Sequence, residues 1–399
     1  MKEKFLLEEV ERKNINSVFH LISKLPNSGT TIFSVMSALA AEHNAINLSQ
    51  GFPDFPIDPV LSELIYDASR KGHNQYALMA GTMQLRENIS ELINDIYSRK
   101  VNPQSEITIT SGATEALFAA VSAVVSPGDE VVMFDPSYDS YEPAVLLNKG
   151  IPVRIPLTFP EYRIDWEKVN KAISKKTRLI IINTPNNPAG SVISDADIQN
   201  LKRTVNGNDI YILSDEVYEH IIFDGAEHCS LIKDEELYQR SFIVSSFGKT
   251  FHITGWKVGY CVAPPVLTAE LRKVHQFLTF STSTPSQFAL AEYIKNIDRV
   301  KDLKYFYTKK RDLFLRLMSE TKFIPLKCEG TYFQLLDYSA ITDENDLEFA
   351  VRMTKECKVA SIPVSVFYKD RKDNKVLRFC FAKEEKTLEA AADRLLSFC

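Results

Sequence analysis

A lysine and an acid stand at the ends of two apolar runs, where they could perform amine chemistry on a bound aldehyde. Lys249 lies shortly after the run 241–244, and Asp215 follows the run 210–214 about thirty residues earlier. If both runs are strands of a parallel sheet, the two side chains meet at one sheet edge. A lysine can form a Schiff base with pyridoxal phosphate, and an acid can keep the pyridine nitrogen of that cofactor protonated. The pair therefore predicts a pyridoxal-phosphate enzyme.

The sequence around Lys249 also allows two other interpretations. Gly248-Lys249-Thr250 could end a nucleotide-binding loop, but position 243, where that loop needs glycine, is isoleucine, and no GxGxxG pattern follows a predicted strand. A lone loop lysine is most often a solvated surface residue. Ser246 and Lys257 argue against that reading, since a hydroxyl and a second cation beside the same loop suit a phosphate dianion.

Strand and helix patterns alternate between about residues 60 and 290, which predicts a mostly parallel sheet with helices on both faces. The expected strands are at 106–110, 130–134, 177–182, 210–214, 241–244 and 258–262, and the clearest helices at 61–71 and 114–125. After Pro285 the pattern changes. The new pattern is one long helical stretch over 286–320, then strands at 331–336 and 376–381, and closing helices. It predicts a smaller α+β domain that packs with the first fifty residues.

The composition argues against several classes of function. The formal net charge is −5 and no basic segment stands out, so no nucleic-acid partner is expected. The six cysteines are scattered without a CxxC pair, which predicts neither a metal site nor a disulfide framework and favours a cytoplasmic protein. Neither a signal-peptide pattern nor a long uncharged apolar run is found, so no membrane partner is expected.

Several spaced motifs resemble those of a known family. They are the segments 47–55, 74–81, 110–117, 135–138, 183–190, 214–218, 245–259 and 377–381. From about Thr30 to Phe381 the chain resembles the class I aminotransferases of pyridoxal-phosphate fold type I, within them the kynurenine–glutamine/methionine aminotransferase group. The resemblance implies a large domain over 49–290, with a mostly parallel seven-stranded sheet sandwiched by helices. It also implies a small, discontinuous α+β domain over 1–48 and 291–399.

The resemblance implies how the phosphate of the cofactor is held. Ala113 and Thr114 match the residues that bind it at the start of a helix, where backbone amides favour an anion. An alternative is that Ser111 or Thr114 only caps that helix. Tyr76 matches a tyrosine that reaches the phosphate of the neighbouring subunit, so the resemblance implies a homodimer.

The resemblance also implies contacts to the cofactor ring. Tyr138 matches the aromatic residue that stacks on the ring. Asn187, which also borders the substrate, and Tyr218 match the donors to its phenolic oxygen. Asp215 matches the partner of the ring nitrogen. Glu216 is a rival for the acid role, but we expect it to face outward because it follows the end of the strand.

Substrate contacts follow from the same resemblance. The backbone of Gly51 and the guanidinium of Arg378 match the groups that hold the substrate carboxylate. Arg378 could instead pair with an acid of the scaffold. Aspartate-type members bring a second arginine from the partner subunit, and the matching segment 280–287 has none. Phe33, which stands where some members carry tryptophan, and Phe280, expected from across the dimer interface, would add aromatic surface.

The function expected from these residues is ping-pong transamination. The amino group of a neutral apolar or aromatic amino acid, of the Met, Phe, Tyr, Gln or kynurenine type, would pass to a 2-oxo acid. The alternative is a pyridoxal-phosphate β-lyase acting on cystathionine or cysteine S-conjugates. A non-catalytic pyridoxal-phosphate regulator is disfavoured, because the chain has no basic N-terminal module for DNA.

Overall fold

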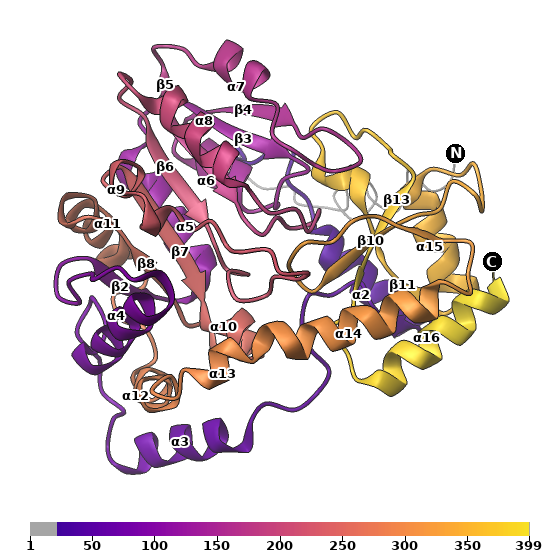
Figure 1. Cartoon of the computed structure of the whole chain (residues 1–399), viewed down its shortest axis with the longest axis horizontal. Coiled ribbons are helices and arrows are strands. Elements are labelled where there is room, and N and C mark those ends of the chain that lie inside the picture. The colour runs from indigo at the N-terminus through magenta and orange to yellow at the C-terminus, as the bar shows by residue number, and fades with distance from the viewer. Residues whose placement is uncertain (1–21, 399) are drawn as a thin grey trace, which may run out of the picture.

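The computed structural model describes residues 22–398 and contains a central seven-stranded sheet (Figure 1). The strand order is β2-β8-β7-β6-β5-β3-β4, and β8 runs antiparallel to its neighbours β2 and β7. The other pairings are parallel. The strands are β2 (Ile107–Thr110), β3 (Glu130–Asp135), β4 (Ile151–Pro156), β5 (Thr177–Asn183), β6 (Tyr211–Asp215), β7 (Ser241–Ser246) and β8 (Gly259–Val262).

Helices cover both faces of this sheet because the side chains of each strand alternate between two apolar cores. Val131 and Met133 of β3 belong to one core, and Val132 and Phe134 to the other. The first face carries α5 (Gly112–Val124), α6 (Tyr141–Leu147) and α11 (Pro265–Leu278). The second core includes residues of α3 (Pro59–Arg70), α4 (Met83–Tyr97), α7 (Trp166–Ala172), α8 (Asp195–Val205), α9 (Glu235–Tyr238) and α12 (Thr284–Tyr293).

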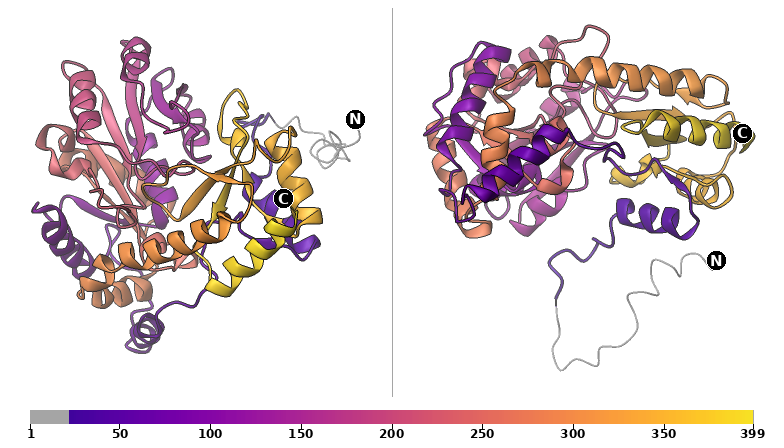
Figure 2. Two further views of the ribbon diagram at one scale, coloured as in Figure 1. Left: turned by 45° about the vertical axis from the view of Figure 1, so that its right-hand side comes forward. Right: turned by 90° about the horizontal axis from the view of Figure 1, so that it is seen from below.

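A third apolar core lies around a smaller sheet of order β12-β13-β10-β9. Its strands are β9 (Ile324–Pro325), β10 (Phe333–Asp337), β12 (Ile362–Pro363) and β13 (Val376–Cys380). The helices here are α2 (Ile32–Glu42), α14 (Leu303–Met318), α15 (Asp346–Glu356) and α16 (Glu385–Phe398). The short strand β1 (Ile46–Asn47) pairs in parallel with β11 (Val359–Ala360), which ties the N-terminal segment to the C-terminal one. In both views of Figure 2 the indigo helix α2 lies on the same side of the molecule as the yellow C-terminal elements.

The predicted mostly parallel sheet between helices is confirmed, and two details differ. The single helix expected over 286–320 is wrong: α12, α13 (Asp298–Lys301) and α14 occupy this region. The side chain of Asn296 accepts a hydrogen bond from the amide of Asp298, and this turn separates α12 from α13. Strand β4 was not predicted from the pattern, since two of its six residues are proline.

The separate third core supports the predicted small domain, whose boundaries stay a prediction. The part of that prediction that concerns residues 1–21 lies outside the described residues. None of the helices within residues 22–398 has the length and apolar character needed to cross a bilayer.

Candidate active site

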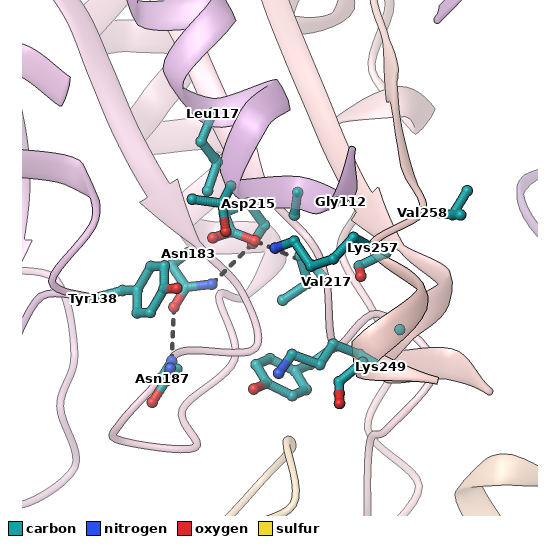
Figure 3. Close-up of a pocket in the computed structure, with 16 residues that line it drawn as sticks. Gly112, Leu117, Tyr138, Asn183, Asn187, Asp215, Val217, Lys249, Lys257 and Val258 are labelled. Carbon is teal, nitrogen blue, oxygen red and sulfur yellow. Dashed lines mark hydrogen bonds between the residues drawn. The ribbon is translucent and has the colours of Figure 1, made fainter. Parts of the chain in front are cut away.

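A cavity of about 190 Å³ opens where β5, β6 and β7 end and α5 begins (Figure 3). These strands are parallel, so their last residues converge on one edge, as expected for ligand sites in α/β proteins. Nine of the residues predicted to hold a cofactor line this cavity: Ala113, Thr114, Tyr138, Asn187, Asp215, Tyr218, Ser246, Lys249 and Lys257.

Lys249 lies in the single-turn helix α10 (Phe247–Thr250), directly after β7. Its Nζ donates to the carbonyl of Gly51 at 3.3 Å and makes no ion pair with a carboxylate among residues 22–398. Burial, together with the nearby charges of Arg378 and Lys257, lowers its pKa to about 8. Near neutral pH the neutral amine, which a nucleophile requires, is therefore far more populated than for a lysine with the usual pKa of 10.5.

Asp215 ends β6 and is buried. Its Oδ2 accepts from the hydroxyl of Tyr141 at 2.6 Å, and its Oδ1 accepts from the amide of Val217 at 3.3 Å. Burial raises the pKa of Asp215 to about 6, although both hydrogen bonds oppose that rise. No cation pairs with the carboxylate in the described part of the chain, so it is available to a protonated ligand nitrogen.

The start of α5 forms a cradle for an anion. The first amides of a helix have no partner within it, and Ser111 at the N-cap makes no side-chain capping bond. The chain turns into the helix at Gly112, whose φ is +74° and whose missing side chain leaves room for Lys257: a Cβ here would lie 3.2 Å from Lys257 Nζ. Ser246 adds a hydroxyl to the same cavity. The side-chain capping considered as an alternative is therefore not found at Ser111.

Arg378 lies in β13 and its side chain is fully enclosed. Its two terminal nitrogens donate to Asn187 Oδ1 at 2.7 Å and to the carbonyl of Ser49 at 2.9 Å. Its Nε has no partner, and no acid pairs with it among the described residues. The alternative that Arg378 pairs with a scaffold acid is therefore wrong.

Aromatic rings surround this guanidinium. Its central carbon lies 3.9 Å from the ring centre of Phe333, 5.1 Å from that of Phe33 and 5.8 Å from that of Phe367. The Phe333 ring also packs against Gly51, where a Cβ would meet it at 2.7 Å. These rings keep water from the guanidinium, which strengthens its attraction for a carboxylate.

Five predicted residues are not part of the cavity lining. Gly51 and Arg378 contact the lining residues Lys249 and Asn187, and Phe33 lies beside Arg378, whereas Tyr76 and Phe280 lie elsewhere. Tyr76 is 83% exposed and Phe280 is 47% exposed. Their rings meet edge to face, with centres 5.4 Å apart. The structure thus places both on the surface, where only a neighbouring molecule could bring them to a site.

The expectation that Glu216 faces outward is wrong. Its side chain is buried, because the backbone still bonds to β7 at this position: the amide of Glu216 donates to the carbonyl of Val244 at 2.8 Å, and the chain turns only afterwards. It accepts from Ser214 Oγ at 2.7 Å and contacts His228 Nε2 at 2.7 Å. Glu216 does not line the cavity, whereas Asp215 does (Figure 3), so the acid of the site is Asp215.

Sequence reasoning missed several residues of the site. Asn183 Nδ2 donates to the carbonyl of Asp215 at 3.0 Å, and Asn183 Oδ1 accepts from the amide of Asn187 at 2.7 Å. Tyr332 donates to the carbonyl of Gly51 at 2.5 Å. Asn183 begins the predicted loop 183–190 and could have been found there. Nothing in the sequence indicates that Tyr141 or Tyr332 reaches the site.

The groups of this cavity fit pyridoxal phosphate. An amine without an acid suits the aldehyde, and a buried carboxylate without a cation suits the ring nitrogen. The open helix start with Ser246 and Lys257 suits the phosphate. A guanidinium with an unpartnered Nε suits the carboxylate of an amino acid.

Comparison with known proteins agrees with this geometry. Residues 43–395 match the family model for aminotransferase class I and II. Methionine aminotransferase of Escherichia coli is 50% identical over 94% of this chain and 97% of its own. Kynurenine–oxoglutarate transaminase of Dictyostelium discoideum is 33% identical over 98% of this chain and 99% of its own.

Solved structures give the same result. The crystal structure of an Escherichia coli protein for which a methionine aminotransferase function was identified superposes with a TM-score of 0.93 at 49% identity, covering 95% of this chain and 100% of the other. N-succinyldiaminopimelate aminotransferase of Mycobacterium tuberculosis gives 0.92 at 34% identity, with 95% and 100% covered.

The chain therefore belongs to the class I and II aminotransferase family. It is a pyridoxal-phosphate-dependent aminotransferase, whose substrates are amino acids and 2-oxo acids. The comparisons give no support to the β-lyase alternative.

Proposed function

We propose that the enzyme transfers the amino group of a neutral apolar or aromatic amino acid, of the Met, Phe, Tyr, Gln or kynurenine type, to a 2-oxo acid. The observation that carries this proposal is the environment of Arg378, a carboxylate-binding group with a free Nε inside a shell of phenylalanine rings. A substrate side chain beside these rings meets apolar surface. The two lysines of the cavity, Lys249 and Lys257, lie on the cofactor side, and the segment 280–287 carries no cation.

The roles of the residues follow from their positions. Lys249 would hold the cofactor, and its Nζ would take the proton from the substrate Cα. Arg378 and the backbone of Gly51 orient the substrate carboxylate, while Phe33 borders its side chain. Pyridoxal phosphate, when bound, supplies the electron sink that makes loss of that proton possible.

Other residues hold the ring and its phosphate. Asp215 would keep the proton on the ring nitrogen, and Asn187 and Tyr218 would donate to the phenolic oxygen. Tyr138 would pack against the ring. The amides of Ala113 and Thr114 would bind the phosphate, together with Ser246 and Lys257.

We also propose a homodimer in which Tyr76 and Phe280 of each chain complete the site of the other. Their exposure in the single chain supports this proposal, since large apolar side chains gathered on a surface mark interfaces. Mixing a Tyr76→Phe chain with a Lys249→Ala chain tests it: only the hybrid contains a whole site, so activity should return on mixing. Mixed chains as inactive as the separate ones would contradict it. The cytoplasmic location stays a prediction.

A half-reaction screen tests the substrate class. The cofactor-loaded protein is mixed with each of the twenty amino acids, and conversion to pyridoxamine phosphate is followed by absorbance. Apolar and aromatic donors should react fastest. Aspartate as the best donor would contradict the proposed pocket, and pyruvate with ammonia from cystathionine would indicate the lyase.

A second experiment tests the lysine. Borohydride reduction followed by peptide mass mapping should find the cofactor on the peptide that contains Lys249, and Lys249→Ala should abolish both the adduct and turnover. Lys295→Ala, which removes only a surface ion pair with Glu292, is the matched control and should keep both.

A further inference from the structure

The ring of His275 joins two segments that are far apart in the sequence. His275 lies near the end of α11, which packs beside α5 (Figure 1), and its side chain is completely buried. Its Nδ1 contacts Glu115 Oε1, and its Nε2 lies 2.8 Å from the carbonyl oxygen of Met79. Glu115 belongs to the first turn of α5, and Met79 lies three residues after Tyr76.

The geometry fixes the net charge of this bridge. A carbonyl oxygen only accepts, so Nε2 carries a hydrogen and donates to Met79. Between Nδ1 and Glu115 one further proton is shared, whether it resides on the ring or on the carboxyl group. The His275–Glu115 pair is neutral in both cases. Without His275, Glu115 would place a bare negative charge beside the phosphate cradle, which would repel a phosphate dianion.

Glu115 is also part of the cradle. Its other carboxyl oxygen accepts the amide of Ser111, the residue at the N-cap of α5. That bond holds the turn that presents the amides of Ala113 and Thr114 to the cavity. A shift of Glu115 would therefore change the cradle directly.

The other end of the bridge holds the segment 74–82, which carries Tyr76. The carbonyl of Ala80 accepts from the amide of Ile109 at 3.0 Å, and a Cβ on Gly81 would lie 2.2 Å from Ile109 Cγ1. This segment therefore lies tightly along β2, the strand that leads into the cradle.

His275 positions the ring partner of Tyr76 as well. The carbonyl of His275 accepts from the amides of Thr279 and Phe280, both at 3.1 Å. The turn to Phe280 thus starts from the residue that holds Met79. The side chain of His275 therefore contacts the cradle and the Tyr76 segment, and its backbone carbonyl contacts the Phe280 turn.

We infer that His275 is a positioning residue that couples the phosphate cradle of its own chain to the Tyr76 and Phe280 that the same chain offers to its partner. This inference rests on the proposed cofactor site and homodimer. Loss of His275 should weaken cofactor binding twice, at its own site through Glu115 and at the partner site through Tyr76.

The two effects can be separated in hybrid dimers, each made of one Lys249→Ala chain and one chain that keeps Lys249. Only one site of such a dimer can bind the cofactor covalently. In the first hybrid, His275→Asn is in the chain that keeps Lys249. In the second, His275→Asn is in the Lys249→Ala chain, so the intact site only borrows from the variant. The hybrid without His275→Asn is the reference. The dissociation constant of pyridoxal phosphate, measured by borohydride trapping, should rise roughly tenfold in both variants, as for loss of a hydrogen bond to a charged group.

His228→Asn is the matched control, because it also removes a buried histidine–glutamate contact, with Glu216, but no link to the cradle or to Tyr76. It should lower the melting temperature comparably and leave both dissociation constants unchanged. The coupling would be overturned if the dissociation constant of pyridoxal phosphate rose only in the first hybrid or in neither hybrid. It would also be overturned if His228→Asn raised that constant equally, or if the wild-type protein were active as a monomer. A wild-type protein that takes up no pyridoxal phosphate would instead refute the proposed function.

Discussion

At the scale of single residues, the site is defined by charged groups that lack the usual opposite charge. Lys249 has no acid, Asp215 has no cation and Arg378 has no carboxylate among the described residues, although Asp215 and Arg378 are buried and Lys249 is half-buried. Burying such groups costs stability unless a ligand later pairs with them. The chain tolerates that cost because the ligand brings an aldehyde, a basic ring nitrogen and a carboxylate.

Tyr141→Phe should slow the enzyme through Asp215. The hydroxyl of Tyr141 lowers the pKa of Asp215, so its loss raises that pKa further above 6 and favours the neutral acid. A neutral Asp215 holds the ring proton poorly, and kcat at pH 7 should fall about tenfold, as for loss of one hydrogen bond to a charged group. The acid-side midpoint of the kcat/KM profile should move to higher pH.

Tyr293→Phe is the control for that variant. Tyr293 also donates to an aspartate, Asp58, at 2.8 Å, and neither residue lines the cavity. It should keep the wild-type profile. An unchanged acid limb in Tyr141→Phe would show that Tyr141 only fills space.

Capture of the cofactor should depend on pH through Lys249. The pKa of this amine is lowered from 10.5 to about 8, so the neutral nucleophile accumulates as pH rises and makes up half of the molecules near pH 8. The rate constant for covalent uptake by cofactor-free protein, followed by absorbance, should rise with pH through a midpoint near 8 and level off about one pH unit above it. A rate that keeps rising towards pH 10 would indicate an ordinary lysine.

At the scale of elements, the sheet edge and most of its side chains follow from the sequence. Apolar runs identified six of the seven strands from their own composition, and the residues at the ends of β5, β6 and β7 line the cavity. Contacts between distant segments could not be predicted. The buried position of Glu216 depends on its contact with His228, which comes from a later turn, and the hydroxyl of Tyr141 reaches Asp215 from 74 residues away. The local sequence pattern contains neither contact.

The start of α5 gives a test at this scale. Gly112→Ala should weaken cofactor binding about tenfold or more, because φ of +74° is strained for alanine and the new Cβ would press on Lys257 Nζ. Gly128→Ala has a similar φ, +89°, with nothing within 4 Å of the new Cβ. Both variants should lose about 1 kcal/mol of unfolding free energy. Only Gly112→Ala should raise the dissociation constant of pyridoxal phosphate, and equal binding in the two would argue against the cradle.

At the scale of the whole molecule, one surface region joins the end of α11 to the segment that carries Tyr76. Phe277 is 86% exposed and Leu78 67%, and they lie within three residues of Phe280 and Tyr76, whose rings contact each other. Large apolar side chains that gather on a surface mark interfaces. In a symmetric homodimer each chain contributes the same surface to the interface, so this region would be covered on both chains.

Phe277→Glu should therefore convert the protein to monomers and lower activity with them. A buried charge without a partner disfavours association, and a monomer lacks the Tyr76 of its neighbour. Molar mass from light scattering and the rate of transamination should fall together as the protein is diluted. Tyr305→Glu makes the same kind of change at a side chain 60% exposed on α14, in the region of the third core, and should leave both unchanged. Monomers of Phe277→Glu with full activity would show that each chain carries a complete site.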